Sequence, residues 1–201
     1  MPSVYGLKPA FQNLLRPITH ALARAGVTAN HVTVAAFLLS VANGACILEF
    51  PEARWPLILI APVLFARMAL NAIDGMLARE HNMKTRLGAI LNELGDVLSD
   101  TALYLPLATR PGFSPMLLVP AVVLSVVSEM TGVLGIQVGA DRRYDGPMGK
   151  SDRAVALGLP ALLVGLGVAP GVWLTALLAL VNVLLVVTIV NRARMALRKG
   201  V

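Results

Sequence analysis

The stretch NAIDGMLAREHNMKTRLGAILNELGDVLSD, residues 71–100, decides how this chain is interpreted. It carries five acidic and four basic side chains, counting His81, although the sequence around it is strongly apolar. The whole chain has 201 residues, of which 57% are hydrophobic and 14% charged, and its mean hydropathy is +0.74. Because soluble domains are about 25% charged, this composition predicts an integral membrane protein.

Six apolar segments were compared with the roughly 20 residues that a helix needs to cross a bilayer. They are His31–Phe50, Pro56–Ala78, Leu87–Thr109, Met116–Val138, Ala154–Val168 and Val172–Val190. Before them, apolar residues such as Phe11 and Leu22 recur at helical spacing opposite Arg16 and Arg24, which predicts an amphipathic helix lying in the membrane interface. We therefore expect an all-α integral membrane protein with one domain over residues 1–201: an interfacial helix at 1–26, six transmembrane helices within 31–190, and a cytoplasmic tail at 191–201.

The distribution of positive charge predicts the orientation of these helices. Of the 17 Lys and Arg residues, 14 lie in the N-terminal helix, in residues 79–86, in residues 139–153 and in the C-terminal tail. Cytoplasmic loops of membrane proteins are enriched in these residues, so both termini and both of these loops are expected on the cytoplasmic side. The same reasoning accounts for the net charge of +6 without nucleic-acid binding. With no signal-peptide layout at the N-terminus, we expect a multi-pass protein of a bacterial inner (plasma) membrane.

Ionisable and amide side chains inside the predicted spans are the next signal, because such groups are costly in a bilayer and usually face a bundle interior or cavity. They are Arg67, Asn71, Asp74, Asn92, Glu93, Asp96, Asp100 and Glu129. Spacings of three and four residues place the polar residues of the second span, Arg67, Asn71 and Asp74, on one face of that helix. Spacings of four place Asn92, Asp96 and Asp100 on one face of the third span, with Glu93 beside it. Several converging carboxylates would repel one another unless a cation neutralised them, and oxygen ligands suit Mg2+ or Mn2+. We therefore expect a divalent-metal site that binds a phosphate-bearing substrate in a cavity open to the cytoplasm.

The same residues form a recognisable motif. Asp74-Gly75-x-x-Ala78-Arg79, eight residues, Gly88, three residues, Asn92, three residues and Asp96 resembles the signature of the CDP-alcohol phosphotransferase family. That signature reads D-x-x-D-G-x-x-A-R, about eight residues, G-x-x-x-D-x-x-x-D. Six spans and an N-terminal interfacial helix also match, so the resemblance covers the whole chain. It implies a metal-dependent membrane enzyme that cleaves the pyrophosphate of a CDP-linked substrate, releases CMP and joins the remaining phosphate group to an alcohol.

The resemblance also implies roles for individual residues. Asp74 would bind the metal that holds the pyrophosphate, and Asp96 would be the general base. The residues that shape the CDP site would be Asp74, Gly75, Ala78, Arg79 and Gly88. Asn71 and Asn92 would occupy the positions of the first and third signature Asp.

These two Asn residues depart from the family pattern. An amide oxygen can ligate a hard cation but adds no negative charge, so we expect weaker metal binding, or one metal in place of two. Glu93 could supply a carboxylate beside Asn92. A shifted assignment, with Asp96 as metal ligand and Asp100 as general base, stays open, and so does a salt bridge between Asp100 and Arg67.

The acceptor is predicted from residues outside the motif. Lys150 and Arg153 precede the fifth span and could hold a phosphate, while Glu129 could line the acceptor pocket or make a structural hydrogen bond. The expected reaction is transfer of a phosphatidyl group from CDP-diacylglycerol to a small polar alcohol, such as glycerol 3-phosphate or another polyol or polyol phosphate, in phospholipid biosynthesis. Family members are commonly homodimers, which is the expectation here. Transfer of a CDP-linked head group to diacylglycerol, and a catalytically silent CDP-lipid-binding protein, remain as alternatives.

Overall fold

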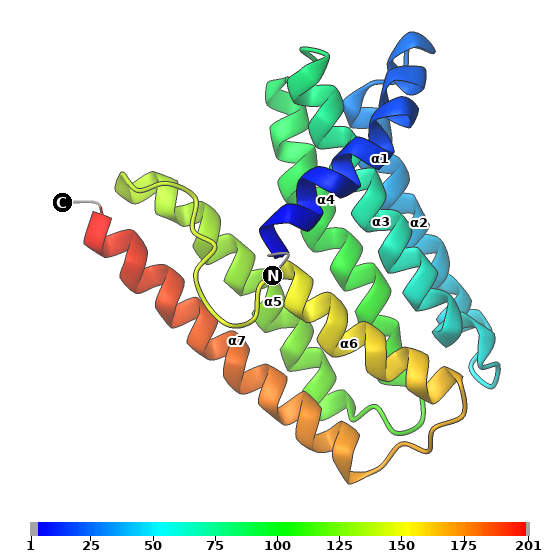
Figure 1. Cartoon of the computed structure of the whole chain (residues 1–201). Coiled ribbons are helices and arrows are strands. Elements are labelled where there is room, and N and C mark those ends of the chain that lie inside the picture. Colours follow the sequence, from blue (N-terminus) through cyan, green and yellow to red (C-terminus); the bar gives the residue numbers. More distant parts are fainter. Residues whose placement is uncertain (1–3, 200–201) are drawn as a thin grey trace. The chain divides into compact units, whose positions relative to one another are not determined.

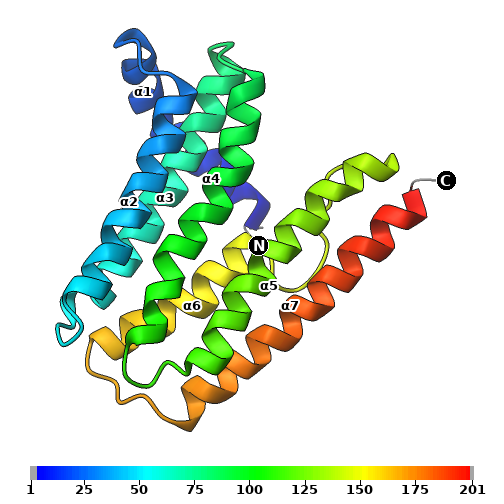
Figure 2. The same cartoon turned by 180° about the vertical axis from the view of Figure 1, so that it is seen from behind.

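A computed structural model describes residues 4–199, and within them the regular structure is helical throughout. Figures 1 and 2 show the helices from opposite sides. In chain order they are α1 Val4–Arg24, α2 Ala29–Glu49, α3 Trp55–Glu80, α4 Arg86–Tyr104, η1 Leu105–Thr109, α5 Pro115–Leu134, η2 Gly135–Val138, α6 Lys150–Gly165 and α7 Val172–Lys199. Every apolar segment predicted from the sequence is therefore helical, and the all-α prediction is confirmed.

Four helices of the described chain are long and apolar enough to cross a membrane: α2, α3, α5 with η2, and α7. The other two predicted spans differ from these for separate reasons. Helix α4 carries Arg86, Glu93, Asp96 and Asp100 within 19 residues, and α6 has only 16 residues. That α4 and α6 also cross the bilayer, giving six spans, stays a prediction.

The chain divides into two compact units. Unit 1 consists of Met1–Ala42 and Pro62–Ser99, and unit 2 consists of Asn43–Ala61 and Asp100–Val201. Helices α2, α3 and α4 contribute residues to both units. Each unit has its own polar centre, and the two are described separately below.

Unit 1 is held together by an apolar core that joins α1 to α2 and α3. Its buried members are Leu15, Ala29, Val32, Ile73, Met76 and Leu77. On the other side of α1, Leu14 and Ile18 are exposed, at 71% and 50% of their surface. The N-terminal segment is thus a helix where one was predicted, with apolar residues both against the core and on its outer surface; its location in the membrane interface stays a prediction.

Threonine caps begin two helices of unit 1. The Thr28 hydroxyl accepts a hydrogen bond from the backbone N of His31, and His31 Nδ1 accepts one from the backbone N of Thr28, both at 3.3 Å. Thr85 accepts a hydrogen bond from the backbone N of Gly88 at 2.8 Å at the start of α4. Because a cap satisfies an N–H group that has no partner within the helix, these threonines determine where α2 and α4 begin.

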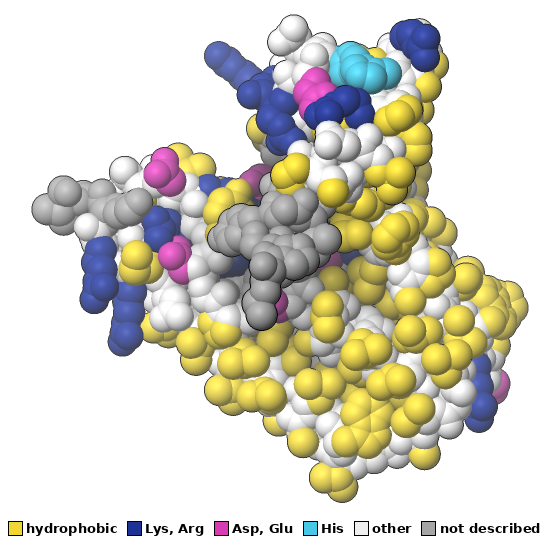
Figure 3. All heavy atoms as spheres, viewed as in Figure 1, with side chains coloured by type: hydrophobic (Ala, Val, Ile, Leu, Met, Phe, Trp, Pro, Cys, Tyr) yellow, Lys and Arg dark blue, Asp and Glu magenta, His cyan; other side chains and the backbone are white. Residues whose placement is uncertain are grey.

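Unit 2 is built on the packing of α5 against α7. Ala121, Val181 and Leu185 are buried there together with Met148 from the connection that precedes α6. That connection passes close to α7 at Gly146, which has a φ of +117° and whose added Cβ would lie 2.7 Å from Thr188 Cα. Figure 3 shows hydrophobic side chains over most of the visible surface of α6 and α7, and Lys and Arg toward the C-terminal end of α7. This pattern agrees with apolar helices in lipid and a basic tail outside it.

Candidate active site

A cavity of about 800 Å³ lies in unit 1, between the start of α2, the C-terminal half of α3 and the first three turns of α4. All eight residues that the sequence prediction assigned to signature positions line it: Asn71, Asp74, Gly75, Ala78, Arg79, Gly88, Asn92 and Asp96. Lys84 and Arg86 line it as well, from the turn between α3 and α4. The structure therefore brings the signature together around one space, as the helical spacing predicted.

Asp74 is held by a residue that the sequence prediction did not include. Thr33 Oγ1 lies 2.9 Å from Asp74 Oδ2 and 3.1 Å from the carbonyl oxygen of Ala29. An ionised carboxylate can only accept hydrogen bonds, so the Thr33 hydroxyl is the donor to Asp74. Asp74 is 94% buried, and its hydrogen bond with Thr33 links α3 to α2.

Asn71 and Asp96 connect the signature residues of α3 with those of α4. Asn71 Nδ2 donates a hydrogen bond to Asp96 Oδ1 at 3.4 Å, a long contact by the usual standard. The two residues stand 25 positions apart in the chain, and the contact links α3 to α4 at the cavity. The prediction that the polar faces of these helices meet is confirmed for this pair.

The two signature glycines leave space for polar side chains at the cavity. A Cβ added to Gly75 would lie 3.1 Å from Arg79 Nη2, so the guanidinium of Arg79 folds back over Gly75. A Cβ added to Gly88 would lie 2.7 Å from Asn30 Oδ1. Asn30 also lines the cavity and was not predicted as a site residue. Its spacing to Thr33, Asn-x-x-Thr at the start of the first span, is the sequence signal that could have identified both.

The donor set of the cavity fits a hard divalent cation. Asp74 and Asp96 offer carboxylate oxygens, and Asn71 and Asn92 offer amide oxygens, which are the ligand types of Mg2+ and Mn2+. Within residues 4–199, no group of three or more His, Cys, Asp or Glu side chains is arranged to hold a metal ion, as is expected of a site in which half of the oxygen donors are amides. Glu93 is not among the described residues that line the cavity, and its role as a metal ligand stays a prediction.

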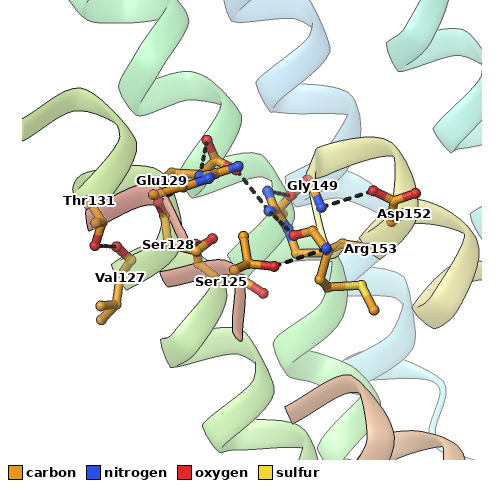
Figure 4. Close-up of polar contacts among 12 residues, drawn as sticks. Ser125, Val127, Ser128, Glu129, Thr131, Gly149, Asp152 and Arg153 are labelled. Atoms are coloured by element: carbon orange, nitrogen blue, oxygen red, sulfur yellow. Dashed lines mark hydrogen bonds and ion pairs between the residues drawn. The ribbon is translucent and has the colours of Figure 1, made fainter. Parts of the chain in front are cut away.

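A second polar centre lies in unit 2, and we call it the arginine cluster: Asp100, Glu129, Arg142, Arg153 and Arg192. Figure 4 labels two of its members, Glu129 and Arg153. Glu129 Oε1 accepts a hydrogen bond from Arg153 Nη1 at 2.8 Å, and its Oε2 lies 3.1 Å from Arg142 Nη2 and 3.3 Å from Arg192 Nη1. Arg153 Nη2 also lies 3.2 Å from Asp100 Oδ2. One carboxylate thus meets three guanidinium groups, which come from the α5–α6 connection, α6 and α7.

The arginine cluster bears on three predictions. Asp100 pairs with Arg153, a partner that the sequence prediction did not include, and this pairing favours a structural role for Asp100; its predicted contact with Arg67 stays a prediction. Glu129 and Arg153, predicted as acceptor-binding residues, lie together. Lys150 is the first residue of α6 and is half-buried.

Arg142 and Arg192 were missed as members of this cluster. In the sequence they look like ordinary positive charges of cytoplasmic segments, one in a loop and one in the tail. Arg192 is nevertheless 98% buried, and its Nη1 donates a hydrogen bond to the carbonyl oxygen of Ser128 at 2.6 Å. Since burial of a tail arginine depends on how α7 packs against α5, no local signal could have identified it.

The connection between α5 and α6 is ordered by an ion pair of its own. Arg143 binds Asp145 through two nitrogens, at 2.8 and 2.9 Å. The hydrogen bond from Arg143 holds the pKa of the Asp145 carboxyl below its usual range. Arg192 Nε donates to the backbone carbonyl of Asp145 at 3.3 Å, which ties this connection to α7.

Comparison with known proteins identifies the family. The sequence profile described as CDP-alcohol phosphatidyltransferase matches residues 26–190. The chain is 46% identical to inner membrane protein YnbA of Escherichia coli K12, over 97% of this chain and 96% of that protein. It is 29% identical to phosphatidylinositol phosphate synthase of Mycolicibacterium smegmatis, over 86% of this chain and 79% of the relative.

Solved structures agree with the sequence relatives. The phosphatidylinositol phosphate synthase of Mycobacterium tuberculosis with CDP-DAG bound superimposes with a TM-score of 0.76 at 25% identity, covering 90% of this chain and 92% of that one. The structure of the same enzyme with manganese and citrate also gives a TM-score of 0.76 at 25% identity, and covers 90% and 88% of the two chains. The manganese in that structure is one of the two divalent cations, Mg2+ and Mn2+, that the sequence predicts as cofactor. The present chain belongs to the CDP-alcohol phosphatidyltransferase family.

Proposed function

We propose that this protein transfers the phosphatidyl group of CDP-diacylglycerol to a small polar alcohol and releases CMP. The observation that carries the proposal is the cavity of about 800 Å³ in unit 1, around which the predicted signature residues of α3 and α4 meet. Family membership makes the chain a CDP-alcohol phosphatidyltransferase, and the relative with CDP-DAG bound supports CDP-diacylglycerol as the donor.

The cavity supports a division of roles among its residues. Asn71, Asp74, Asn92 and Asp96 would hold Mg2+ or Mn2+, which neutralises charge on the pyrophosphate. Thr33 positions Asp74 by its hydrogen bond, and Arg79, folded over Gly75, places a positive charge where the nucleotide phosphates would approach. Gly75 and Gly88 have no side chain, which leaves room for the side chains of Arg79 and Asn30 beside the two helix backbones.

Asp96 is the proposed general base. In the reaction, the acceptor hydroxyl oxygen forms a bond to the phosphorus that carries the diacylglycerol, the bond from that phosphorus to the CMP oxygen breaks, and the hydroxyl proton passes to the Asp96 carboxylate. The hydrogen bond from Asn71 to Asp96 Oδ1 orients this carboxylate toward α3. Catalysis then depends on position and charge more than on covalent chemistry by the protein.

The membrane arrangement follows from the same reasoning. The protein is a membrane protein with apolar helices, and its relative in Escherichia coli is an inner membrane protein. We place both termini and the cavity on the cytoplasmic side, because Lys84 and Arg86 line the cavity and cytoplasmic loops are rich in these residues. CMP and the acceptor would then exchange with the cytoplasm while the acyl chains stay in the bilayer. A homodimer remains part of the proposal.

A polyol is the proposed class of acceptor. The mycobacterial relatives are named as phosphatidylinositol phosphate synthases, which supports a small polyhydroxylated acceptor here. Glycerol 3-phosphate and inositol phosphate, together with the free polyols, form the set to be compared experimentally.

The proposal is tested by CMP release from CDP-diacylglycerol by the purified protein with Mn2+ or Mg2+ and a panel of polyols and polyol phosphates. We expect release that depends on both metal and acceptor, and its loss in Asp96→Asn. Asn82→Asp, an exposed change in the α3–α4 turn, is the matched control and should stay active.

Other outcomes would select the alternatives. CMP release only from a CDP-linked head group with diacylglycerol as acceptor would establish the reverse partition of the substrate. Binding of CDP-diacylglycerol without CMP release under any combination would favour a catalytically silent protein.

A further inference from the structure

A second pocket of unit 1 lies between the C-terminal end of α1 and the turn that follows α3. It has a volume of about 580 Å³ and is lined by His20, Ala23, Arg24, His81 and Met83. Of these residues, only Met83 also lines the larger cavity. The polar groups of the lining are therefore one guanidinium and two imidazoles, with no carboxylate among the described residues that line it.

The polar groups of this pocket are not used up by pairing inside the protein. The rings of His20 and His81 meet edge to face, with centroids 5.1 Å apart. His81 Nε2 is buried and has no hydrogen-bond partner in the part of the chain that the structure describes. Over the same residues, the Arg24 guanidinium forms no ion pair or hydrogen bond. The pocket thus combines one cation with imidazole groups that can still bind a ligand.

The carboxylate next to the pocket is already paired. Glu80 precedes His81 but does not line the pocket, and its two oxygens accept hydrogen bonds from Arg16 at 3.1 and 3.2 Å. Because Arg16 matches the charge of Glu80, the positive charge of Arg24 remains for a ligand. A cation near the C-terminal end of a helix is favourable by itself, which would explain Arg24 alone but not the two imidazoles around the same space.

The outer surface of α1 favours a lipid as that ligand. Arg16, His20 and Arg24 follow one another at intervals of four and share one face of α1. Leu14 and Ile18 share another face, and both are exposed. A helix with a basic face and an exposed apolar face is typical of the membrane interface, where basic side chains meet anionic headgroups. His is visible at the surface beside basic side chains in the region of α1 (Figure 3).

We propose that His20, Arg24 and His81 form a second binding site, which takes the phosphate group of an anionic membrane lipid. The guanidinium supplies the positive charge, and each imidazole donates a hydrogen bond in either of its protonation states. Since two of the residues lie on α1 and the third directly follows α3, a bound headgroup links these two helices. The site takes no part in the chemistry of the larger cavity and does not depend on phosphatidyl transfer.

The test follows the histidine ring signals by NMR, with the full chain labelled at histidine in detergent micelles without divalent cations. The chain has three His, and His31, which accepts a hydrogen bond from Thr28 at the start of α2, is the internal reference. The probes are dioctanoyl phosphatidylglycerol, which is anionic, dioctanoyl phosphatidylcholine, which has a phosphate but no net charge, and inorganic phosphate. We expect phosphatidylglycerol to shift the signals of His20 and His81 with one midpoint and to leave His31 unchanged.

A pair of matched variants identifies the cation. Arg24→Gln should raise the midpoint concentration of phosphatidylglycerol by about tenfold, which corresponds to about 1.4 kcal/mol. Arg198→Gln removes the same charge from an exposed position near the end of α7 and should leave the midpoint unchanged.

Inorganic phosphate distinguishes the source of the phosphate group. We expect it to shift the same two signals only at a higher concentration than phosphatidylglycerol, because it has no acyl chains to contact the exposed apolar face of α1. Equal midpoints for the two probes would retain the phosphate site and assign it to the free ion.

Three results overturn the proposal. They are no shift of His20 and His81 with either anionic probe, equal midpoints for phosphatidylglycerol and phosphatidylcholine, and equal effects of Arg24→Gln and Arg198→Gln, as unspecific attraction to a basic chain would give. If Arg24→Gln does not fold, the comparison of His20 and His81 with His31 in the wild-type chain still decides. Because CMP release is not the readout, a failure of the proposed function leaves this result intact.

Discussion

The cavity of unit 1 and the arginine cluster of unit 2 both contain charged residues in an apolar chain, but the first set borders an open space and the second is packed within the protein. Around the cavity, Asp74, Asp96 and Arg79 border a space of about 800 Å³ together with three neutral asparagine amides. In the cluster, Glu129 and Asp100 meet guanidinium groups at 2.8 to 3.3 Å within the protein.

This difference predicts different roles for the two regions: ligand binding for the cavity and stabilisation of the folded chain for the cluster. Polar groups that line an accessible cavity can exchange water for a ligand, so changing them should alter turnover or metal affinity. Buried ions that already have partners contribute to the folded state, and removing one partner leaves the other as an uncompensated buried charge. Mutations around the cavity should therefore change turnover or metal affinity, and mutations in the arginine cluster should change the stability of the folded chain.

The largest expected effect is on catalysis, from Asp96→Asn in the cavity. Loss of a general base slows proton transfer, so kcat for CMP release should fall by about 10²–10⁴-fold, with binding of CDP-diacylglycerol retained. Asp100→Asn is the companion variant: if it abolished turnover without loss of stability while Asp96→Asn stayed active, the shifted assignment of the base would be correct.

The next effect is on stability, from Arg153→Gln in the arginine cluster. This change removes the ion pairs to Asp100 and Glu129, and we expect the free energy of unfolding to fall by about 3–5 kcal/mol. Denaturant unfolding in detergent micelles measures it. Arg16→Gln is the control, because its pair with Glu80 at 3.1 Å is exposed and should matter little. Equal effects of the two variants would remove the distinction between the buried cluster and a surface pair.

A smaller effect is expected on metal affinity when charge is restored to the cavity. Asn71→Asp and Asn92→Asp each add a carboxylate to the proposed ligand set, and the Mn2+ concentration that half-saturates CMP release should fall by roughly tenfold in each. Asn82→Asp adds the same charge outside the cavity and should leave this concentration unchanged. No decrease in either cavity variant would argue against Asn71 and Asn92 as metal ligands.

The smallest effect concerns the pH dependence of the connection between α5 and α6. Because the pKa of Asp145 is lowered in the folded chain by Arg143, the unfolded chain takes up the proton first as pH falls. The stabilisation is therefore fully present above about pH 4, the ordinary range of an Asp carboxyl, and is lost as pH falls through the lower folded value. Unfolding temperatures of the wild type and Asp145→Asn should differ at pH 7 and converge below pH 4; a constant difference would contradict this origin.

Much of the candidate site could be predicted from the sequence, because its lining depends on spacing along two helices. The intervals between Asn71, Asp74 and Arg79 and between Gly88, Asn92 and Asp96 place these side chains on the faces that line the cavity. Thr33 and Asn30 were not identified as site residues, because helix capping alone explains Asn30 in the Asn-x-x-Thr spacing; the packing of α2 is what brings them to Asp74 and Gly88.

The sequence by itself determined that this chain is an apolar helical membrane protein with the signature of its family, because composition and helical periodicity are local properties. Only the tertiary structure decided that Arg142 and Arg192, two apparently ordinary cytoplasmic charges, converge on Glu129 with Arg153. These three arginines lie 13, 24 and 63 positions after Glu129 in the chain, and such separations produce no periodic pattern in a sequence. Those charges are buried only in the packed arrangement of α5, α6 and α7, since a guanidinium group away from water needs a counter-charge beside it.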